Sequence, residues 1–399
     1  MRLIDPQRER SALSVAAFTA AVFSLLPLST DLYLPSLPGL RQDLGISGAE
    51  AQLTLSMFIV AFGIAQLFWG PVSDRFGRRP ALIAGISLYM LATVACMFSP
   101  SIEYLVAARF AQGFGACSGQ VMARAIIRDL YEPREGARIL AYMMLLFLIG
   151  PLFGPLIGGH LTVWFGWRAN FAFLLVFGVC VMAATWTLLG ETNRDRDPVA
   201  TSAARFLANA RIIWSNRTFI GYTLCVTFSY CGVFTFLSAF PFVLKDVLNV
   251  PVEQFGWWFM AAVSGNVVGA TLCSRLTHRL ALADIQLLAG IISTAGGVAI
   301  VLFSGDGSPS PLGLIVPMIV YLIGHGITTP VCLAAAVGPF PTMAGTASGL
   351  LGVTQLLVAS VVGQVVLRNY DGTTRSLAFG VGIFGVAVLL ARLLLIRRG

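Results

Sequence analysis

Charged residues are scarce in this sequence of 399 residues. Asp, Glu, Lys and Arg make up 11% of the chain and hydrophobic residues 57%, whereas an average soluble domain is about 25% charged. So few polar side chains cannot coat the surface of a globule in water. The composition therefore predicts a membrane protein and argues against a soluble globular domain.

Histidine and paired cysteine are also in short supply. The three histidines, His160, His278 and His325, lie far apart on different segments. The seven cysteines are spread through apolar stretches without the C-x-x-C spacing of metal or redox sites, and such cysteines behave as small hydrophobic residues. We therefore expect no metal site, no disulfide framework, no nucleophile triad and no bound cofactor, and we do not expect an enzyme.

Long apolar segments, in contrast, recur along the whole chain. A helix needs about 20 apolar residues to cross a bilayer core of about 30 Å. Runs such as FAFLLVFGVCVMAATWTLL are apolar on every face, which indicates helices, because barrel strands are about ten residues long and alternate polar with apolar. The twelve expected spans are 12–34, 50–70, 80–98, 102–123, 138–160, 167–190, 217–241, 253–275, 283–304, 310–331, 342–366 and 375–396.

The first of these spans also has the basic start and apolar body of a signal peptide. It is too long for one and has no small-x-small cleavage site before Asp31. We therefore expect it to be a permanent helix.

The distribution of Lys and Arg predicts the orientation of the spans. Twenty of the 26 basic residues fall in the N-terminus, the C-terminus and every second loop, five fall on the opposite side, and Arg109 lies inside a span. By the positive-inside rule both termini are cytoplasmic. The net charge of +8 is then an excess facing an anionic leaflet and requires no nucleic-acid partner.

The longest polar interruption divides the spans into six and six. We predict an N-terminal six-helix half over residues 1–190, a cytoplasmic linker loop over 191–216 and a C-terminal six-helix half over 217–399. Two bundled halves around a shared cavity are typical of transporters that bind substrate near the membrane midplane.

Several motifs carry a resemblance. Residues 70–80, GPVSDRFGRRP, resemble the loop between helices two and three of the major facilitator superfamily. Residues 109–113, RFAQG, are similar to its Arg-x-x-Gln-Gly element, and residues 150–159, GPLFGPLIGG, to the Gly-Pro motif of its antiporters. Residues 31–38, 236–243 and 343–348 are similar to the Bcr/CflA multidrug-resistance branch. The resemblance implies an all-α membrane protein with the major-facilitator fold, twelve transmembrane helices in two halves.

The 70–80 loop combines two glycines, one acid and three arginines. We expect Gly70 and Gly77 to permit a tight reversal, and Asp74 to meet the N-terminal N–H groups of the span that begins near Pro341. Such a contact would form a conformational latch on the cytoplasmic side. The alternative is an ordinary positive-inside loop. The residues assigned to the latch are Gly70, Asp74, Arg75, Gly77, Arg78 and Arg79.

The Gly-Pro element spaces small residues four apart on one helix face, which predicts close helix packing and a kink. Small-x-x-x-small also occurs in many tightly packed membrane helix pairs. The resemblance implies that in antiporters this face contacts a helix of the other half. The residues are Gly150, Pro151, Gly154, Pro155, Gly158 and Gly159.

Asp31 and Arg109 are the candidate proton-coupling residues. We place both in the outer half of the bilayer, where they could meet or share a cavity. Buried carboxylates respond to the loss of water by binding a proton, so Asp31 is a candidate proton carrier; alternatively it caps the end of the first span. Arg109 needs several acceptors, such as Gln112, helix carbonyls or Asp31, and could equally be a static structural arginine.

The predicted function is export of small, mainly apolar compounds across a bacterial inner membrane in exchange for protons, by alternating access of a monomer. A proton-coupled importer on the same fold, or a polytopic sensor or membrane enzyme, are the alternatives. A cavity for apolar substrates needs aromatic and thioether walls. The candidate lining residues are Tyr33, Gln112, Tyr142, Met143, Met144, Phe147, Tyr230, Phe236 and Phe240.

Overall fold

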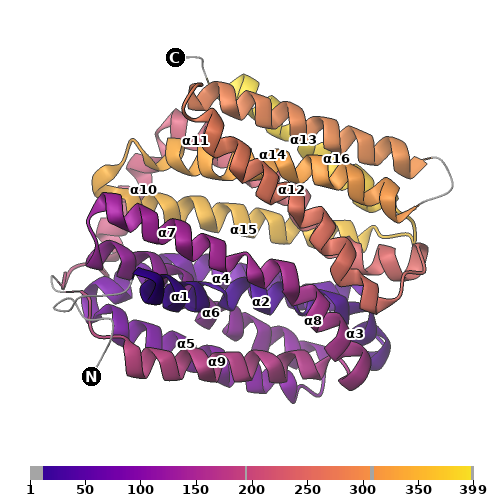
Figure 1. The fold of residues 1–399 in the computed structure, drawn as a ribbon, viewed down its shortest axis with the longest axis horizontal. Coiled ribbons are helices and arrows are strands. Elements are labelled where there is room, and N and C mark those ends of the chain that lie inside the picture. The colour runs from indigo at the N-terminus through magenta and orange to yellow at the C-terminus, as the bar shows by residue number, and fades with distance from the viewer. Residues whose placement is uncertain (1–11, 194–195, 306–309, 397–399) are drawn as a thin grey trace. The chain divides into compact units, whose positions relative to one another are not determined.

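The computed structural model describes residues 12–193, 196–305 and 310–396, and nearly all of them are helical (Figure 1). Within these residues, ten helices are long and apolar enough to cross a membrane, and a bent pair, Ala12–Phe23 with Leu25–Leu44, makes an eleventh. The remaining expected span, 102–123, lies in α6 (Ile102–Leu130). That helix is long enough to cross a membrane. It is less apolar than the other ten, because it carries Arg109, Gln112 and Gln120 in its middle.

Contacts divide the chain into two compact units. Among the described residues, unit 1 contains those from Ala12 to Leu44 and from Met57 to Ala203, and unit 2 contains those from Gly45 to Ser56 and from Ala204 to Ile396. The 191–216 segment, expected as a linker loop, contains helix α10 (Ala203–Trp214) at the boundary.

Unit 1 is built around α6, which packs against α5 and the helices of the first span. Its other long helices are the later part of α4 and the pair α8 and α9. The elements are α1 (Ala12–Phe23), α2 (Leu25–Asp31), η1 (Leu34–Ser36), α3 (Leu37–Leu44), α4 (Gly48–Phe76), α5 (Arg78–Met97), α6, α7 (Pro133–Phe147), α8 (Ile149–Phe165) and α9 (Arg168–Leu188).

The first span is broken rather than straight. Pro27 lacks the N–H that would donate to the carbonyl of Phe23, and its ring clashes with that carbonyl, so α1 ends at Phe23 and α2 begins at Leu25. α1 meets the stretch that follows it, Leu25–Leu44, at 44°. Within that stretch α2 is a short helix that ends at Asp31.

Unit 2 is a bundle in which α14 packs against α11, α12 and α13, and α16 packs against α11 and α13. A π-type turn, η2, extends α11. The elements are α11 (Arg217–Phe242), η2 (Val243–Val247), η3 (Val252–Gln254), α12 (Phe255–Leu276), α13 (Leu282–Gly305), α14 (Pro311–Val337), η4 (Pro341–Met343), α15 (Ala344–Arg368) and α16 (Arg375–Leu395).

The first nine residues of α4 also belong to unit 2. Ser47 and Glu50 exchange hydrogen bonds that cap the helix: the Ser47 N–H donates to the Glu50 carboxylate at 2.7 Å, and the Glu50 N–H donates to the Ser47 hydroxyl at 3.2 Å. Gln52 donates to Ser238 of α11 at 2.6 Å, and Gln364 of α15 donates to the carbonyl of Ala49 at 3.0 Å. These bonds join the start of α4 to two helices that follow much later in the chain.

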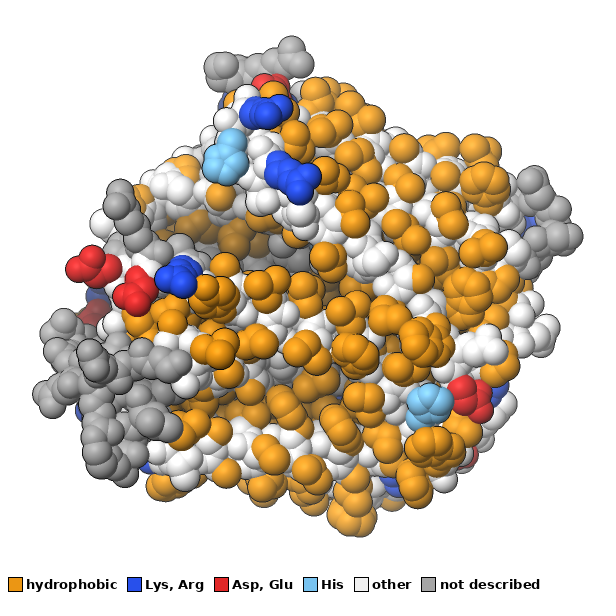
Figure 2. All heavy atoms as spheres, in the orientation of Figure 1, with side chains coloured by type: hydrophobic (Ala, Val, Ile, Leu, Met, Phe, Trp, Pro, Cys, Tyr) orange, Lys and Arg blue, Asp and Glu red, His pale blue; other side chains and the backbone are white. Residues whose placement is uncertain are grey.

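Large apolar side chains are exposed on most of the long helices, for example Leu91 on α5, Val176 on α9 and Leu394 on α16. On the face drawn in Figure 2, hydrophobic side chains cover most of the surface and the charged side chains lie toward its margins. An exposed apolar surface of this extent suits helices that face lipid.

Candidate functional site

Arg109 lies on α6 and is fully buried. Its Nη1 donates to Oε1 of Gln112, one turn further along the same helix, at 2.6 Å. Its Nη2 donates to the backbone carbonyl of Ser29 on α2 at 3.1 Å. A guanidinium is always charged and has five N–H donors. Two of its nitrogens are bound here, one by the Gln112 side chain of α6 and one by the Ser29 carbonyl of α2.

Further polar groups extend this arrangement. Gln112 donates to the hydroxyl of Thr93 on α5 at 2.8 Å, and the hydroxyls of Ser29 and Tyr89 lie 2.9 Å apart. The network therefore joins α2, α5 and α6 inside unit 1. Among the described residues the Nε of Arg109 has no hydrogen-bond partner, so the network satisfies the guanidinium in part.

Aromatic rings surround the charge of Arg109. The guanidinium carbon lies 4.6 Å from the ring centroid of Tyr33, 4.4 Å from that of Phe58 and 5.8 Å from that of Phe171. Each cation–π contact contributes about 0.5–2 kcal/mol, more when desolvated. Tyr33, expected in the substrate cavity, is thus a buried wall of the Arg109 site.

Asp31 is the last residue of α2 and is 7% exposed. Its carboxylate accepts a hydrogen bond from the neighbouring Thr30 hydroxyl at 3.0 Å. Among the described residues it forms no ion pair within 4 Å. Of the acceptors considered for Arg109, Gln112 and a helix carbonyl are therefore used, and Asp31 is not. Arg109 donates instead to the Ser29 carbonyl, which lies in the last turn of α2, where helix carbonyls lack an intrahelical N–H partner.

The Gly-Pro element on α8 packs against the segment that carries Asp31. A Cβ added to Gly150 would lie 3.8 Å from Leu28, and one added to Gly154 would lie 3.4 Å from the Leu32 nitrogen and 3.5 Å from Cβ of Asp31. A Cβ on Gly158 would overlap the carbonyl of Leu32. The element therefore faces a helix of its own unit here; Pro155 lies inside α8 and Gly159 is buried with the other glycines.

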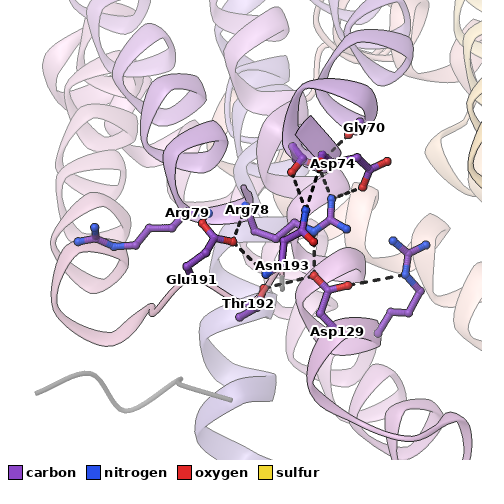
Figure 3. Close-up of polar contacts among 10 residues, drawn as sticks. Gly70, Asp74, Arg78, Arg79, Asp129, Glu191, Thr192 and Asn193 are labelled. Carbon is purple, nitrogen blue, oxygen red and sulfur yellow. Dashed lines mark hydrogen bonds and ion pairs between the residues drawn. The ribbon is translucent and has the colours of Figure 1, made fainter. Parts of the chain in front are cut away.

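The connection between α4 and α5 is organised by Arg78 (Figure 3). Its Nη1 donates to the carboxylate of Asp74 and, at 2.6 Å, to the hydroxyl of Ser73. Its Nε donates to Oδ2 of Asp129, near the end of α6, at 2.8 Å. One buried guanidinium thus joins the end of α4 to the end of α6.

Glu191 caps the start of α5 in the same view. Its carboxylate accepts from the N–H groups of Arg78 at 2.8 Å and Arg79 at 3.3 Å, which are otherwise orphan donors of a first helical turn. Asn193 donates to the carbonyls of Ser73 and Asp74 at 3.2 and 3.1 Å. The residues after α9 therefore hold the α4–α5 turn from outside it.

Gly77 makes the turn, and Gly70 does not. Gly77 has φ +108, a conformation that L side chains rarely adopt, and a Cβ there would collide with the Glu191 carboxylate. Gly70 lies inside α4, and a Cβ there would meet nothing within 4 Å. The expectation that both glycines permit the reversal is wrong for Gly70.

The other arginines of this loop bind the following segments of unit 1. Arg75 donates to Thr201 at 2.8 Å, and Arg79 donates to the carbonyl of Trp186 at 3.3 Å and lies 5.1 Å from its ring centroid. The contact of Asp74 with the span near Pro341 would join the two units and stays a prediction.

Sequence reasoning missed Asp129, Glu191, Thr192 and Asn193. Asp129 accepts from both Arg78 and Thr192, the latter at 3.3 Å. A signal was present, because Glu-Thr-Asn follows directly on the sixth span and Asp129 follows directly on Arg128 at the end of the fourth. In a chain with so few acids, each acid beside a basic loop is a candidate partner for it.

The predicted cavity residues fall in both units. Phe147 of unit 1 packs edge-on against Phe23 with centroids 5.1 Å apart, Met143 is buried and Met144 is exposed; Tyr142 accepts a hydrogen bond from the exposed Arg138. In unit 2, Phe236 and Phe240 are buried with centroids 4.5 Å apart, and Tyr230 packs on Phe234. That these residues line one shared cavity stays a prediction.

No group of three or more His, Cys, Asp or Glu side chains able to hold a metal ion occurs in the described parts of the chain. Two apolar grooves, lined by residues of α13 and α16 and of α15 and α16, lie on unit 2. In unit 1, the buried polar and charged side chains that we consider as the candidate site are the Arg109 network, Asp31 and the α4–α5 turn.

Ten helices long and apolar enough to cross a membrane, with a bent pair as an eleventh, occur in the described part of the chain and are the fold of a multi-pass membrane protein. The chain belongs to the Major Facilitator Superfamily, whose family model matches residues 17–364. This confirms the expected all-α fold of that family and a function in transport rather than catalysis. Small molecules are accordingly its substrates.

Relatives support this assignment. The chain is 28% identical to the bicyclomycin resistance protein homolog of Haemophilus influenzae, covering 96% of each chain, and 29% identical to multidrug resistance protein D of Escherichia coli, covering 93% of each. The solved structure of the xylose transporter XylE from E. coli superimposes with a TM-score of 0.77 over 97% of each chain, at 15% identity. The last likeness concerns the fold alone.

Proposed function

We propose that this protein exports small, mainly apolar drugs or toxic compounds in exchange for protons. The names of the relatives from H. influenzae and E. coli support drug export. The observation that carries proton coupling is Asp31: a carboxylate that is 7% exposed, lies within a membrane span and forms no ion pair among the described residues. Such a group binds and releases a proton at modest free-energy cost when its surroundings change.

Arg109 serves this function by holding α2 at the Ser29 carbonyl. The carboxylate two residues later keeps its own proton equilibrium, because the guanidinium is bound elsewhere. Gly154 and Gly158 let α8 approach the same stretch closely. Protonation of Asp31 and loading of substrate then favour different conformations, each by its differential affinity for the two states.

The remaining parts of the proposal concern topology. In this proposal the protein is a monomer in the bacterial inner membrane. Both termini face the cytoplasm, because Lys and Arg concentrate on that side. The N-terminal and C-terminal halves, 1–190 and 217–399, enclose the cavity lined by the aromatic and methionine residues named above. Asp74 and the arginines of the α4–α5 turn act as the latch at the cytoplasmic end.

Import of a nutrient is not favoured, since the likeness to a xylose transporter is at 15% identity and extends to the fold only. The test is an efflux screen across antibiotic classes in a host without its own pumps, followed by measurement of proton movement in inverted vesicles for each exported compound. Export without proton movement would contradict proton coupling. Proton-driven accumulation of a compound inside cells would show that the protein imports its substrate.

A further inference from the structure

A second ionisable side chain lies in the middle of a span, in unit 2. His325 stands near the centre of α14 and is 8% exposed. In the described spans of unit 2, the other charged residues all stand close to a helix end or in the turns that follow. These are Glu50, Arg217, Lys245, Asp246, Glu253, Arg275, Asp284, Arg368, Arg375 and Arg392.

The imidazole has a hydroxyl at each nitrogen. Nδ1 lies 2.9 Å from the Ser229 hydroxyl on α11, and Nε2 lies 3.4 Å from the Thr329 hydroxyl, one turn further along α14. Thr329 also donates to the carbonyl of His325 at 3.1 Å. Of the two contacts to the ring nitrogens, the one between Nδ1 and Ser229 is the shorter.

The backbone at Ser229 is held in place. The Tyr321 hydroxyl of α14 donates to the carbonyl of Ser229 at 3.0 Å, and the Tyr230 ring lies 6.0 Å from the imidazole. Tyr230 on α11 is thus a titratable side chain beside the imidazole, and Tyr321, one turn before His325 on α14, points its hydroxyl to the Ser229 carbonyl. The charged residues of α12, α13 and α15, the other helices packed on α14, are the remote ones at the helix ends named above.

Hydroxyl partners suit both protonation states of a histidine. A neutral ring has one donor and one acceptor nitrogen, and a protonated ring has two donors. A hydroxyl can donate or accept, so Ser229 and Thr329 can rotate their O–H groups to satisfy either form without movement of the ring. A carboxylate partner would favour the charged form, and a backbone N–H would favour the neutral form.

We propose that the imidazole of His325, held between the hydroxyls of Ser229 and Thr329, is a second proton-binding site of this transporter. The proton comes from and returns to the aqueous phase, and no other bond changes. Each unit then has its own buried group that can exchange a proton: Asp31 in unit 1 and His325 in unit 2. Because it assigns a second coupled proton, the inference rests on the proposed function.

The first experiment observes proton binding directly and needs no substrate. NMR of the purified protein with isotopically labelled histidine gives one signal set for each of His160, His278 and His325. Loss of a signal in His325→Gln assigns that residue; if this variant does not fold, His160→Gln and His278→Gln assign it by elimination. We expect the His325 signal to change from neutral to protonated as pH is lowered over the range in which the protein is active. A signal that stays neutral throughout overturns the proposal.

The second experiment measures protons moved per molecule of each compound that the efflux screen identifies, in proteoliposomes. We expect His325→Gln to move one proton fewer than the wild type, and the exposed control His278→Gln to match the wild type. Ser229→Ala keeps the imidazole but removes its 2.9 Å partner, and it should shift the pH midpoint of transport by about half a unit or more. An unchanged proton ratio in His325→Gln overturns the proposal, whereas absence of proton movement in the wild type contradicts the proposed function.

Discussion

The guanidinium of Arg109 donates to the backbone carbonyl of Ser29 at 3.1 Å, two residues before Asp31. The arginine therefore fixes the helix that carries the carboxylate without pairing with the carboxylate itself. The positive charge of Arg109 and the geometry of its hydrogen bonds can therefore be tested separately by substitution.

Arg109→Lys should lower efflux by about tenfold or more, although it keeps the positive charge. An ammonium lacks the planar fork whose two terminal nitrogens bind Gln112 and the Ser29 carbonyl. A buried acceptor left without its donor costs about 1–3 kcal/mol. Efflux is measured at matched expression over a range of external pH. Arg138→Lys, at an exposed arginine, is the control. Near wild-type transport with a shifted pH optimum would mean that charge alone matters.

Asp31→Asn should abolish substrate-driven proton movement while the protein still inserts in the membrane. Asn keeps the acceptor for the Thr30 hydroxyl but cannot bind a proton in the transport range. Proton release from inverted vesicles is the measurement, with Asp371→Asn, at an exposed acid, as the control. Proton release at the wild-type level would exclude Asp31 from the coupling.

Alanine substitutions along α8 should impair transport in a graded order. An added Cβ at Gly150 makes ordinary contact at 3.8 Å, at Gly154 a tight contact at 3.4 Å, and at Gly158 an overlap with the Leu32 carbonyl. Backbone cannot move aside as a flexible side chain does, so Gly158→Ala should displace the stretch around Asp31 and lose most activity. Equal loss at all three positions would mean that the face acts only as a smooth packing surface.

Gly77→Ala should lower the midpoint of thermal unfolding more than Gly166→Ala. Both glycines have positive φ, +108 and +81, and each substitution costs about 1 kcal/mol for that reason. Only Gly77 faces a carboxylate, because nothing lies within 4 Å of a Cβ at Gly166. Displacing Glu191 from the first turn of α5 should cost about 0.5–2 kcal/mol more. Equal midpoints in the two variants would show that Glu191 moves without cost.

Asp74→Asn and Asp129→Asn should have different effects. The first leaves Arg78 bound to Asp129 and Ser73, so the unfolding midpoint should hold, while labelling of single cysteines in the inner cavity rises if Asp74 latches the halves. The second removes the negative charge that faces a buried guanidinium at 2.8 Å, so the midpoint should fall. Unchanged labelling in Asp74→Asn would limit that residue to its contact with Arg78.

The long helices, and the need of Arg109 for several acceptors, could be predicted from single residues and short sequence patterns. Gln112 lies one turn away on the same helix, so a helical period predicts its contact with Arg109. Glu191 is 113 positions from Arg78, and no local pattern pairs them. The bond from Arg109 to the Ser29 carbonyl depends on where α2 ends after the break at Pro27, which composition does not reveal.

The start of α4 has a consequence for how the chain is made. Gln52 precedes its partner Ser238 by 186 positions, and Ala49 precedes Gln364 by 315. A ribosome therefore delivers this helix to the membrane long before its partners exist, and the Gln52 amide must stay with water or the insertion machinery until α11 arrives. An N-terminal half synthesised alone would leave that amide uncovered, and supplying the other half from a second gene would restore its partner.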